Sequence, residues 1–337
     1  MSFKNILGQE YAKGIFRNIL QKGSLAHAYI FFGPGGTGKS LFANEVTKSL
    51  NCIDMDGDVD PCDKCISCKK VDSGTSSDVI RISLDKGRKL IGIDEVRTLQ
   101  GSAALKPVES DIKTFIINDT VKLSEEAFNC LLKTLEEPPP STLIILLVNS
   151  MDALPETIVS RCQVIRFFNL PVNLVNSYLQ EQFKVEKDIS EWISTLSGGS
   201  IGYATMINDE GLFEKNELLV ERLIKLTVED NFNLSKEIHS WFAGKETPEE
   251  KRSYLKIVLE LFLSFYRDIL IIKTNSADDG RYLNRTQRRV MEFKAKSCSV
   301  DSLITIIDQI IFAINDVNAN ANTSFLLENL LTNIASI

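Results

Sequence analysis

The sequence predicts an α/β domain with a mainly parallel sheet in the first half of the chain, followed by a wholly helical remainder. Short apolar, β-rich runs alternate with segments of helical periodicity up to about residue 167. After Pro171 the strand signals stop and only helical periodicity remains. The chain of 337 residues is also too long for one ordinary core, so we expect two or three domains.

Five runs are the candidate strands of the sheet. Each is nearly continuous in apolar residues, which is typical of strands that are buried on both faces. The segments between them have the period of helices, so a doubly wound arrangement is expected. The candidate strands are Ala28–Phe32, Val79–Ile82, Thr114–Asn118, Leu143–Asn149 and Val164–Phe167.

The later part of the chain carries clear helix signals. Ser190–Leu196 has helical periodicity and ends before two glycines, as is common at the end of a helix. Farther on, Thr247 is a candidate N-cap, Pro248 occupies the first helical position, and Glu250 follows the threonine by three residues. This capping pattern predicts a helix over about 248–272.

The composition is that of a soluble globular protein. Hydrophobic residues make up 44% and charged residues 25%, which excludes a disordered or collagen-like chain. The net charge of −7 argues against tight autonomous binding to DNA. The N-terminus has no apolar run behind a basic start, and charges interrupt the apolar stretch Leu255–Ile272. We therefore expect a cytoplasmic protein without a membrane anchor.

A phosphate-binding loop follows the first candidate strand. Residues 33–40 fit the pattern G-x-x-x-x-G-K-[ST] between a buried strand and a helix. In such a loop the backbone N–H groups converge on phosphate oxygens, the lysine adds a positive charge, and the serine reaches Mg²⁺. We expect ATP and Mg²⁺ to be held by Gly33, Gly35, Gly36, Thr37, Gly38, Lys39 and Ser40.

His27 lies just upstream of the strand that leads into this loop. It is a candidate catalytic base, but a lone histidine before a buried strand is more often a structural residue that makes hydrogen bonds. We therefore predict a structural role for His27.

Four of the seven cysteines crowd into residues 52–68. Cys52, Cys62, Cys65 and Cys68 have the spacing C-x9-C-x2-C-x2-C, which can place four thiolates tetrahedrally around Zn²⁺. No histidine stands nearby, so the pattern indicates a closed, structural site made of sulfur alone. The segment is rich in Asp, Gly and Lys, which favours zinc over an iron–sulfur cluster or a redox pair.

Several runs together resemble bacterial clamp-loader subunits of the AAA+ class, strongly over the first 170 residues and weakly to the end. Besides the phosphate-binding loop and the cysteine module, these runs are Ile6–Glu10, Leu25–Tyr29, Leu131–Pro139 and Ser160–Cys162. The resemblance implies an AAA+ nucleotide-binding domain at 1–170 with a zinc module at 52–68. It also implies a small helical lid at 171–208 and a helical collar at 209–337 that joins other subunits.

Two types of clamp-loader subunit share these runs, the ATP-hydrolysing gamma or tau type and the delta-prime type. In the ATPase type an aspartate that holds Mg²⁺ and a glutamate that orients water end a central strand, whereas Asn118 and Asp119 stand here. In a register shifted by one residue, Asp119 takes the metal and no glutamate follows. Gly202 stands where the ATPase type has an arginine on the γ-phosphate.

These departures favour a delta-prime subunit that can bind ATP but hydrolyses it weakly or not at all. The alternative is a gamma or tau motor subunit. A P-loop kinase acting on small molecules would explain neither the cysteine module nor the long helical part. Asn149 is placed like the polar residue that senses the γ-phosphate in this class, and the competing interpretation is a cap at the end of its strand.

Arg161 is the residue for which the resemblance implies a catalytic role. In the family, the arginine of the Ser-Arg-Cys run reaches the γ-phosphate bound by a neighbouring subunit, and such fingers contribute about 10³–10⁵ in rate. The alternative is a surface arginine that caps a short helix over Pro155–Val159. The implied partners are the gamma/tau and delta subunits of the DNA polymerase III holoenzyme, the sliding clamp and, through the assembly, primed DNA.

Overall fold

A computed structural model describes most of the chain. The described residues are 3, 6–55, 59–85, 87–227, 229–274, 282–319 and 322–336. Contacts within the chain divide it into two compact units. Unit 1 comprises Met1–Lys184 with Ser197–Met206, and unit 2 comprises Val185–Leu196 with Ile207–Ile337.

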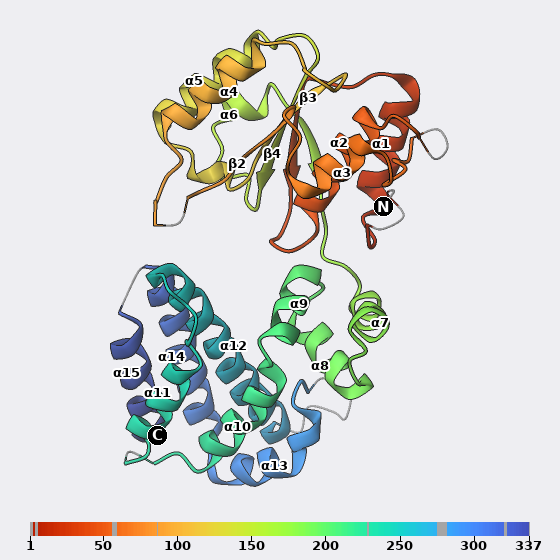
Figure 1. The fold of residues 1–337 in the computed structure, drawn as a ribbon. Helices are drawn as coiled ribbons and strands as arrows, with labels where there is room; N and C mark the ends of the chain where they lie inside the picture. The colour runs from red at the N-terminus through yellow and green to blue at the C-terminus, as the bar shows by residue number, and fades with distance from the viewer. Residues whose placement is uncertain are drawn as a thin grey trace. The chain divides into compact units, whose positions relative to one another are not determined.

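A five-stranded sheet forms the centre of unit 1 (Figure 1). Its strand order is β2-β3-β4-β1-β5, and each pair of neighbours is parallel. The strands are β1 (Ala28–Phe32), β2 (Val79–Ile82), β3 (Lys113–Ile117), β4 (Thr142–Val148) and β5 (Gln163–Arg166). The predicted parallel α/β fold is therefore confirmed, with strand ends that differ by one residue at most from the predicted ones.

Helices cover both faces of this sheet (Figure 1). Because side chains alternate along a strand, Ala28 and Ile30 of β1 enter one apolar core while Tyr29 and Phe31 enter the other. The first core includes side chains of α4 (Ile93–Ala103), α5 (Glu125–Glu136) and α6 (Glu156–Val159). The second includes side chains of α1 (Glu10–Lys22), α2 (Lys39–Asn51) and α3 (Ile66–Ser73). The short helix η2 (Thr120–Lys122) follows β3.

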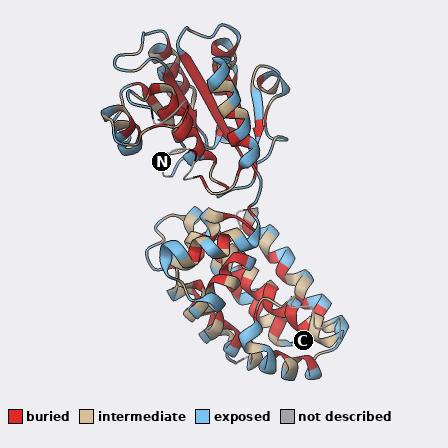
Figure 2. Ribbon diagram, turned by 90° about the vertical axis from the view of Figure 1, so that its right-hand side faces the viewer, coloured by how far each residue is buried: buried red, intermediate tan, exposed pale blue. Residues whose placement is uncertain are grey.

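The rest of the described chain is helical, as predicted. Its helices are α7 (Val172–Phe183), α8 (Lys187–Leu196), α9 (Ile201–Asp209), α10 (Leu212–Ile224), α11 (Asn231–Ser240), α12 (Pro248–Lys273), η3 (Arg285–Gln287), α13 (Arg288–Ser297), α14 (Val300–Asn318) and α15 (Thr323–Ser336). Helix α12 is the longest helix among the described residues, and it packs against α13 and α14. Figure 2 shows that the helices of unit 2 turn buried faces toward one another. Thr247 and Glu250 form the predicted capping box at the start of α12.

The predicted lid is shared between the two units. Helix α7 and the first part of α9 belong to unit 1, whereas α8 belongs to unit 2, where Trp192 packs edge to face on Phe213. The domain boundaries at 1–170, 171–208 and 209–337 therefore remain predictions.

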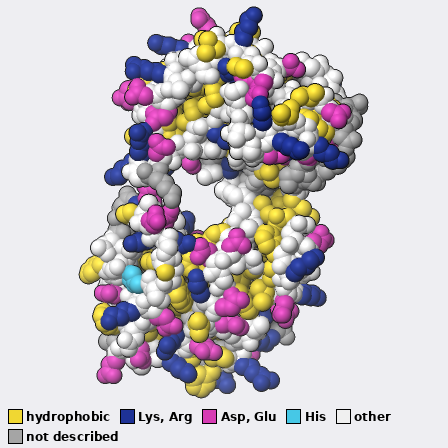
Figure 3. Space-filling model, in the orientation of Figure 1, with side chains coloured by type: hydrophobic (Ala, Val, Ile, Leu, Met, Phe, Trp, Pro, Cys, Tyr) yellow, Lys and Arg dark blue, Asp and Glu magenta, His cyan; other side chains and the backbone are white. Residues whose placement is uncertain are grey.

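The surface carries both signs of charge. On the face drawn in Figure 3, basic and acidic side chains alternate over each unit instead of forming one patch of a single sign. Among the described residues no single helix is both long and apolar enough to cross a membrane. One pair, Arg285–Ser297 with Val300–Val317, meets the test of length and composition together, but it is bent by 113°.

Candidate nucleotide site and cysteine cluster

The phosphate-binding loop connects β1 to α2, as predicted, and two glycines allow close approaches of other elements. A Cβ on Gly33 would lie 2.3 Å from the backbone oxygen of Phe167, just after β5. Gly36 has φ 70°, and a Cβ there would lie 2.3 Å from Oγ of Ser200. The loop is therefore contacted from two sides, by the backbone of Phe167 and by the side chain of Ser200, at distances that leave no room for a Cβ.

Lys39 lies buried in the middle of the loop and is 8% exposed. Its Nζ donates hydrogen bonds to the backbone oxygens of Gly33 and Pro34, at 2.6 and 2.7 Å, and to Oδ1 of Asn149 at 2.9 Å. Burial disfavours the charged form and lowers the pKa of Lys39 to about 8. The ammonium group is thus oriented by three oxygens at the point where phosphate oxygens approach a P-loop.

A cavity of about 410 Å³ opens over this loop. Seven of the predicted site residues line it, together with Asn118, Gly202 and four apolar residues. The seven are Gly35, Gly36, Gly38, Lys39, Ser40, Asp119 and Asn149. Thr37 does not line the cavity and is 2% exposed. Its hydroxyl donates a hydrogen bond within the loop, to the backbone oxygen of Pro34 at 2.8 Å.

The far side of the cavity contains the end of β3. Asn118 is half-buried there, and its backbone N–H donates a hydrogen bond to the backbone oxygen of Ile82 at 2.7 Å. Asp119 is exposed and has the left-handed backbone angles φ 48° and ψ 40° that begin η2. Both residues line the cavity, so the structure places the predicted pair opposite the phosphate-binding loop.

The start of α9 docks directly on the loop. The backbone N–H of Gly202 donates to the oxygen of Gly36 at 2.9 Å, and the hydroxyl of Ser200 donates to the oxygen of Gly35 at 3.0 Å. A Cβ on Gly202 would lie 2.9 Å from the Cα of Gly36. Sequence reasoning treated Gly202 as the loss of an arginine. The structure adds that glycine is what lets two backbones touch here.

Gln9 is a residue of this site that sequence reasoning missed. It is 7% exposed, and its Nε2 donates to the backbone oxygens of Thr37 and Phe168, at 3.1 and 2.7 Å. Its Oε1 accepts the N–H of Phe168 at 3.1 Å. The side chain amide thereby ties the loop to the end of β5. Gln9 belongs to the run Ile6–Glu10, which is part of the family resemblance, but nothing in that run predicts a contact with the phosphate-binding loop.

Arg161 lies just after α6 and does not line the cavity of its own chain. Its guanidinium donates to Oε1 of Glu136 at 2.7 Å and to the backbone oxygen of Thr157 at 2.9 Å. The second contact is that of a residue capping the end of α6, and the first holds the arginine over α5. The side chain remains 34% exposed, so it is open to a partner.

His27 also lies outside the cavity lining. Its backbone oxygen accepts the N–H of Ile144 at 2.9 Å. Its Nε2 is buried without a hydrogen-bond partner among the described residues, so the predicted hydrogen-bonding role is wrong for this nitrogen.

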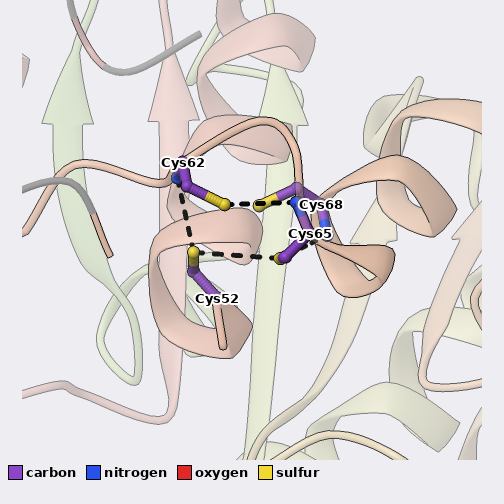
Figure 4. A group of neighbouring side chains, drawn as sticks. All are labelled: Cys52, Cys62, Cys65 and Cys68. Carbon is purple, nitrogen blue, oxygen red and sulfur yellow. Dashed lines mark hydrogen bonds between the residues drawn. The ribbon is translucent and has the colours of Figure 1, made fainter. Parts of the chain in front are cut away.

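The four predicted cysteines meet in one cluster (Figure 4). Their sulfur atoms all lie within 4.8 Å of one another. Backbone N–H groups of Cys62, Cys65 and Cys68 donate to the sulfurs of Cys52, Cys62 and Cys65, at 3.2–3.4 Å. Burial alone would raise the pKa of Cys65, but the N–H groups of Cys68 and Ile53 lower it to about 6. Such a group of sulfurs can hold a metal ion.

The fold and this site define the class of protein. A P-loop that joins the first strand of a parallel sheet to a helix, with residues after β3 and β4 lining the same cavity, is the phosphate-binding arrangement of P-loop proteins. Residues 8–171 match the model of the family described as "DNA polymerase III, delta subunit".

Relatives found by sequence are named after other subunits of the same polymerase. The tau subunit of DNA polymerase III from Bacillus subtilis is 31% identical over 294 residues, covering 82% of this chain and 51% of the relative. The gamma/tau subunit from Mycoplasma genitalium is 33% identical over 239 residues, covering 69% of this chain and 39% of the relative. The chain thus spans about half the length of these relatives or less.

Among solved structures, the comparison finds a gamma subunit-related protein from Thermotoga maritima. It is 18% identical, has a TM-score of 0.49, and the match covers 97% of this chain and 99% of that one. The sequence relatives support the gamma/tau alternative better than the delta-prime interpretation.

Proposed function

We propose that this chain is a subunit of the DNA polymerase III clamp loader that binds ATP and Mg²⁺ at residues 33–40. The cavity over the phosphate-binding loop is the observation that carries the proposal, because Lys39, Asn149 and the backbone of Gly202 converge on it. The family match over residues 8–171 supports the assignment to this polymerase. The proposed partners are the other loader subunits, the sliding clamp and primed DNA, in the cytoplasm.

The gamma/tau type is the first candidate for the kind of subunit. The relatives carry that name, and the alignment with the Bacillus subtilis tau subunit extends over 82% of this chain. In this role the chain would hydrolyse ATP to drive loading of the clamp.

The delta-prime type is the second candidate, and it rests on the residues of the site. An amide at Asn118 carries no charge for Mg²⁺, and Asp119 is shorter than the glutamate that orients water in AAA+ ATPases. Gly202 offers only backbone to the cavity. Phosphate binding survives these changes, whereas in-line attack by water depends on groups that position it.

One experiment separates the two candidates. ATP hydrolysis is measured for the purified chain alone, and again with the other loader subunits, the clamp and primed DNA. Robust turnover by the chain alone supports the gamma/tau type and rules out the delta-prime type. Nucleotide binding without turnover supports the delta-prime type, and failure to bind nucleotide would contradict the proposed site itself.

Arg161 is proposed to act in trans on the nucleotide of a neighbouring subunit. Its exposure and its absence from the cavity of its own chain support this role. Arg161→Ala should lower the ATPase rate of the assembled loader about 10³-fold or more without preventing assembly. Arg161→Lys, which keeps the charge but not the planar fork, is the matched variant and should also lose most of the rate. An unchanged rate in both variants would leave Arg161 as a helix cap.

The cysteine cluster is proposed to hold structural Zn²⁺. The mutual distances within 4.8 Å and the all-sulfur donor set fit a tetrahedral thiolate site. Metal analysis should find about one zinc per chain, with loss in Cys65→Ser and retention in Cys130→Ser, which changes a cysteine outside the cluster. Full zinc retention in Cys65→Ser would contradict the assignment of the cysteine cluster as the zinc site.

A further inference from the structure

One helix connects the two sites. Helix α2 begins at Lys39, in the phosphate-binding loop, and ends at Asn51, directly before the metal-site residue Cys52. With a rise of about 1.5 Å per residue, the helix separates its ends by about 20 Å. A change in how α2 is held at one end is therefore carried as a rigid displacement to the other end.

Lys48 is the charged residue that fastens α2 to the cysteine module. Its side chain is 1% exposed, and Nζ lies 2.7 Å from Oδ1 of Asp63 and 3.1 Å from Oδ1 of Asp72. Asp63 follows the metal-site residue Cys62. Asp72 belongs to α3, the helix that begins after Cys65 and contains Cys68. Two carboxylates of the module thus meet one buried ammonium of α2.

A third carboxylate makes Lys48 indispensable to this arrangement. Glu45, one helical turn earlier in α2, is fully buried, and its Oε1 lies 2.8 Å from Nζ of Lys48. Apart from the ammonium of Lys48, the two oxygens of Glu45 have no hydrogen-bond partner among the described residues. Because a buried carboxylate without a counter-charge is strongly unfavourable, Glu45 keeps the ammonium in place when the module moves.

Arg81 of β2 adds a connection between the same helices through two uncharged acceptors. Its Nη2 donates to Oδ1 of Asn44 in α2 and to the backbone oxygen of Val71 in α3, both at 3.0 Å. Side chains of α2, β2 and the cysteine module therefore join the module to α2. These contacts lie between the nucleotide site and the cysteine cluster.

We propose that Lys48 is a positioning residue through which metal binding at the cysteine cluster raises the affinity of the phosphate-binding loop for nucleotide. The metal fixes residues 62–68, these fix Asp63 and Asp72, and the two carboxylates hold α2 with Lys39 at its start. The inference rests on the proposed function, since it concerns the same nucleotide site. Coupling of this kind is reciprocal, so nucleotide must also retain the metal.

The first test is the dependence of nucleotide affinity on zinc. Titration with a fluorescent ATP analogue compares the zinc-loaded chain with the chain after chelation, and circular dichroism checks that both are folded. Affinity should fall at least about fivefold on zinc removal, the lower end of usual coupling between sites. A nucleotide affinity that is the same with and without zinc would overturn this inference but not the proposed function. No binding by the zinc-loaded chain would overturn the proposed function as well.

The decisive variant is Asp63→Asn with Asp72→Asn. It removes both ion pairs between the module and α2 but leaves Lys48 paired with Glu45. Asn tolerates the left-handed φ of 58° at position 63, so the backbone is not strained. The double variant should still bind zinc, while zinc removal should change its nucleotide affinity clearly less than that of the unchanged protein, because only Arg81 and the chain at Cys52 still join the module to α2. Full zinc dependence in this variant would refute the role of Lys48.

A second measurement covers the case in which the chain unfolds without zinc. Saturating nucleotide should slow the release of zinc to a chelator at least about fivefold in the unchanged protein and not in the double variant. Lys70→Met is the control, because Lys70 of α3 forms its ion pair with Glu109, which lies between α4 and β3 and not in α2. It should behave like the unchanged protein in both measurements. Equal release rates with and without nucleotide would overturn the coupling.

Discussion

The two halves of the nucleotide site differ in how firmly the fold holds them. In the phosphate-binding half, Lys39 is buried with three oxygen partners, and Gln9 and Gly202 fix the loop from neighbouring elements. In the half at the end of β3, Asn118 brings no charge and Asp119 is an exposed residue at a turn. Under the proposed function, binding and hydrolysis of nucleotide would depend on different elements, and the structure holds the elements for binding more firmly.

The difference shows why a P-loop alone does not identify an ATPase. Phosphate binding needs backbone N–H groups and one positive charge, which a single loop and helix supply. Hydrolysis also needs an aligned water and stabilisation of charge in the transition state. In this chain the residues at the corresponding place follow β3, outside the phosphate-binding loop, so each half can be changed by itself.

Removal of Lys39 should have the largest effect. Lys39→Met keeps the length of the side chain but removes the charge that faces the phosphates, so nucleotide affinity should fall about 100-fold or more. Titration with a fluorescent ATP analogue measures the change. Lys122→Met, at an exposed lysine of η2, is the control and should bind normally. Unaltered binding by Lys39→Met would show that nucleotide does not use this loop.

The second largest effect is expected when Gly202 is replaced by alanine. The Cβ of Gly202→Ala would lie 2.9 Å from the Cα of Gly36, so the start of α9 must move off the loop, at a cost of about 1–3 kcal/mol. Thermal unfolding of unit 1 measures this cost. Gly14→Ala, in α1 where a Cβ meets nothing within 4 Å, should instead stabilise by up to about 1 kcal/mol. Equal effects of the two changes would mean that the contact at Gly202 is not tight.

Sequence patterns predicted the binding half well because its groups are local. The loop, its strand and its helix are contiguous, so residues 33–40 were recognisable from spacing alone. The five strands were found for a similar reason, since each is a continuous apolar run. The cysteine cluster was also predicted from spacing, although the metal itself was not fixed by it.

Contacts between distant residues were not predictable in this way. Gln9 and Phe168 are 159 positions apart, and no periodicity relates them. The tight approach of Gly202 to Gly36 depends on how α9 docks, which the sequence does not encode locally. The sharing of the lid between two units arises similarly, because helical periodicity shows that a helix has a buried face but not what covers it.

The half at the end of β3 can be tested by restoring acidic groups. Asn118→Asp combined with Asp119→Glu supplies a carboxylate for Mg²⁺ and a longer one for water, so ATP hydrolysis should rise about tenfold. Nucleotide affinity should change little, because the loop is untouched. Single-turnover hydrolysis compares the double variant with each single change. A loss of hydrolysis in Asp119→Glu alone would favour the shifted register, in which Asp119 already holds the metal.

The smallest expected effect is that of pH on binding. Burial lowers the pKa of Lys39 to about 8, so its ammonium is charged below that pH and loses its proton as the pH rises through it. Affinity for nucleotide should therefore fall between pH 7 and pH 9, by up to about tenfold, and less if bound phosphate raises the pKa of the lysine. Lys39→Arg is the control, because a guanidinium stays charged throughout this range and its binding curve should be flat. If the unchanged protein bound nucleotide equally well at both pH values, Lys39 would not be the buried, titrating cation of the loop. The contrast between the phosphate-binding loop and the end of β3 would then rest on the backbone of the loop alone.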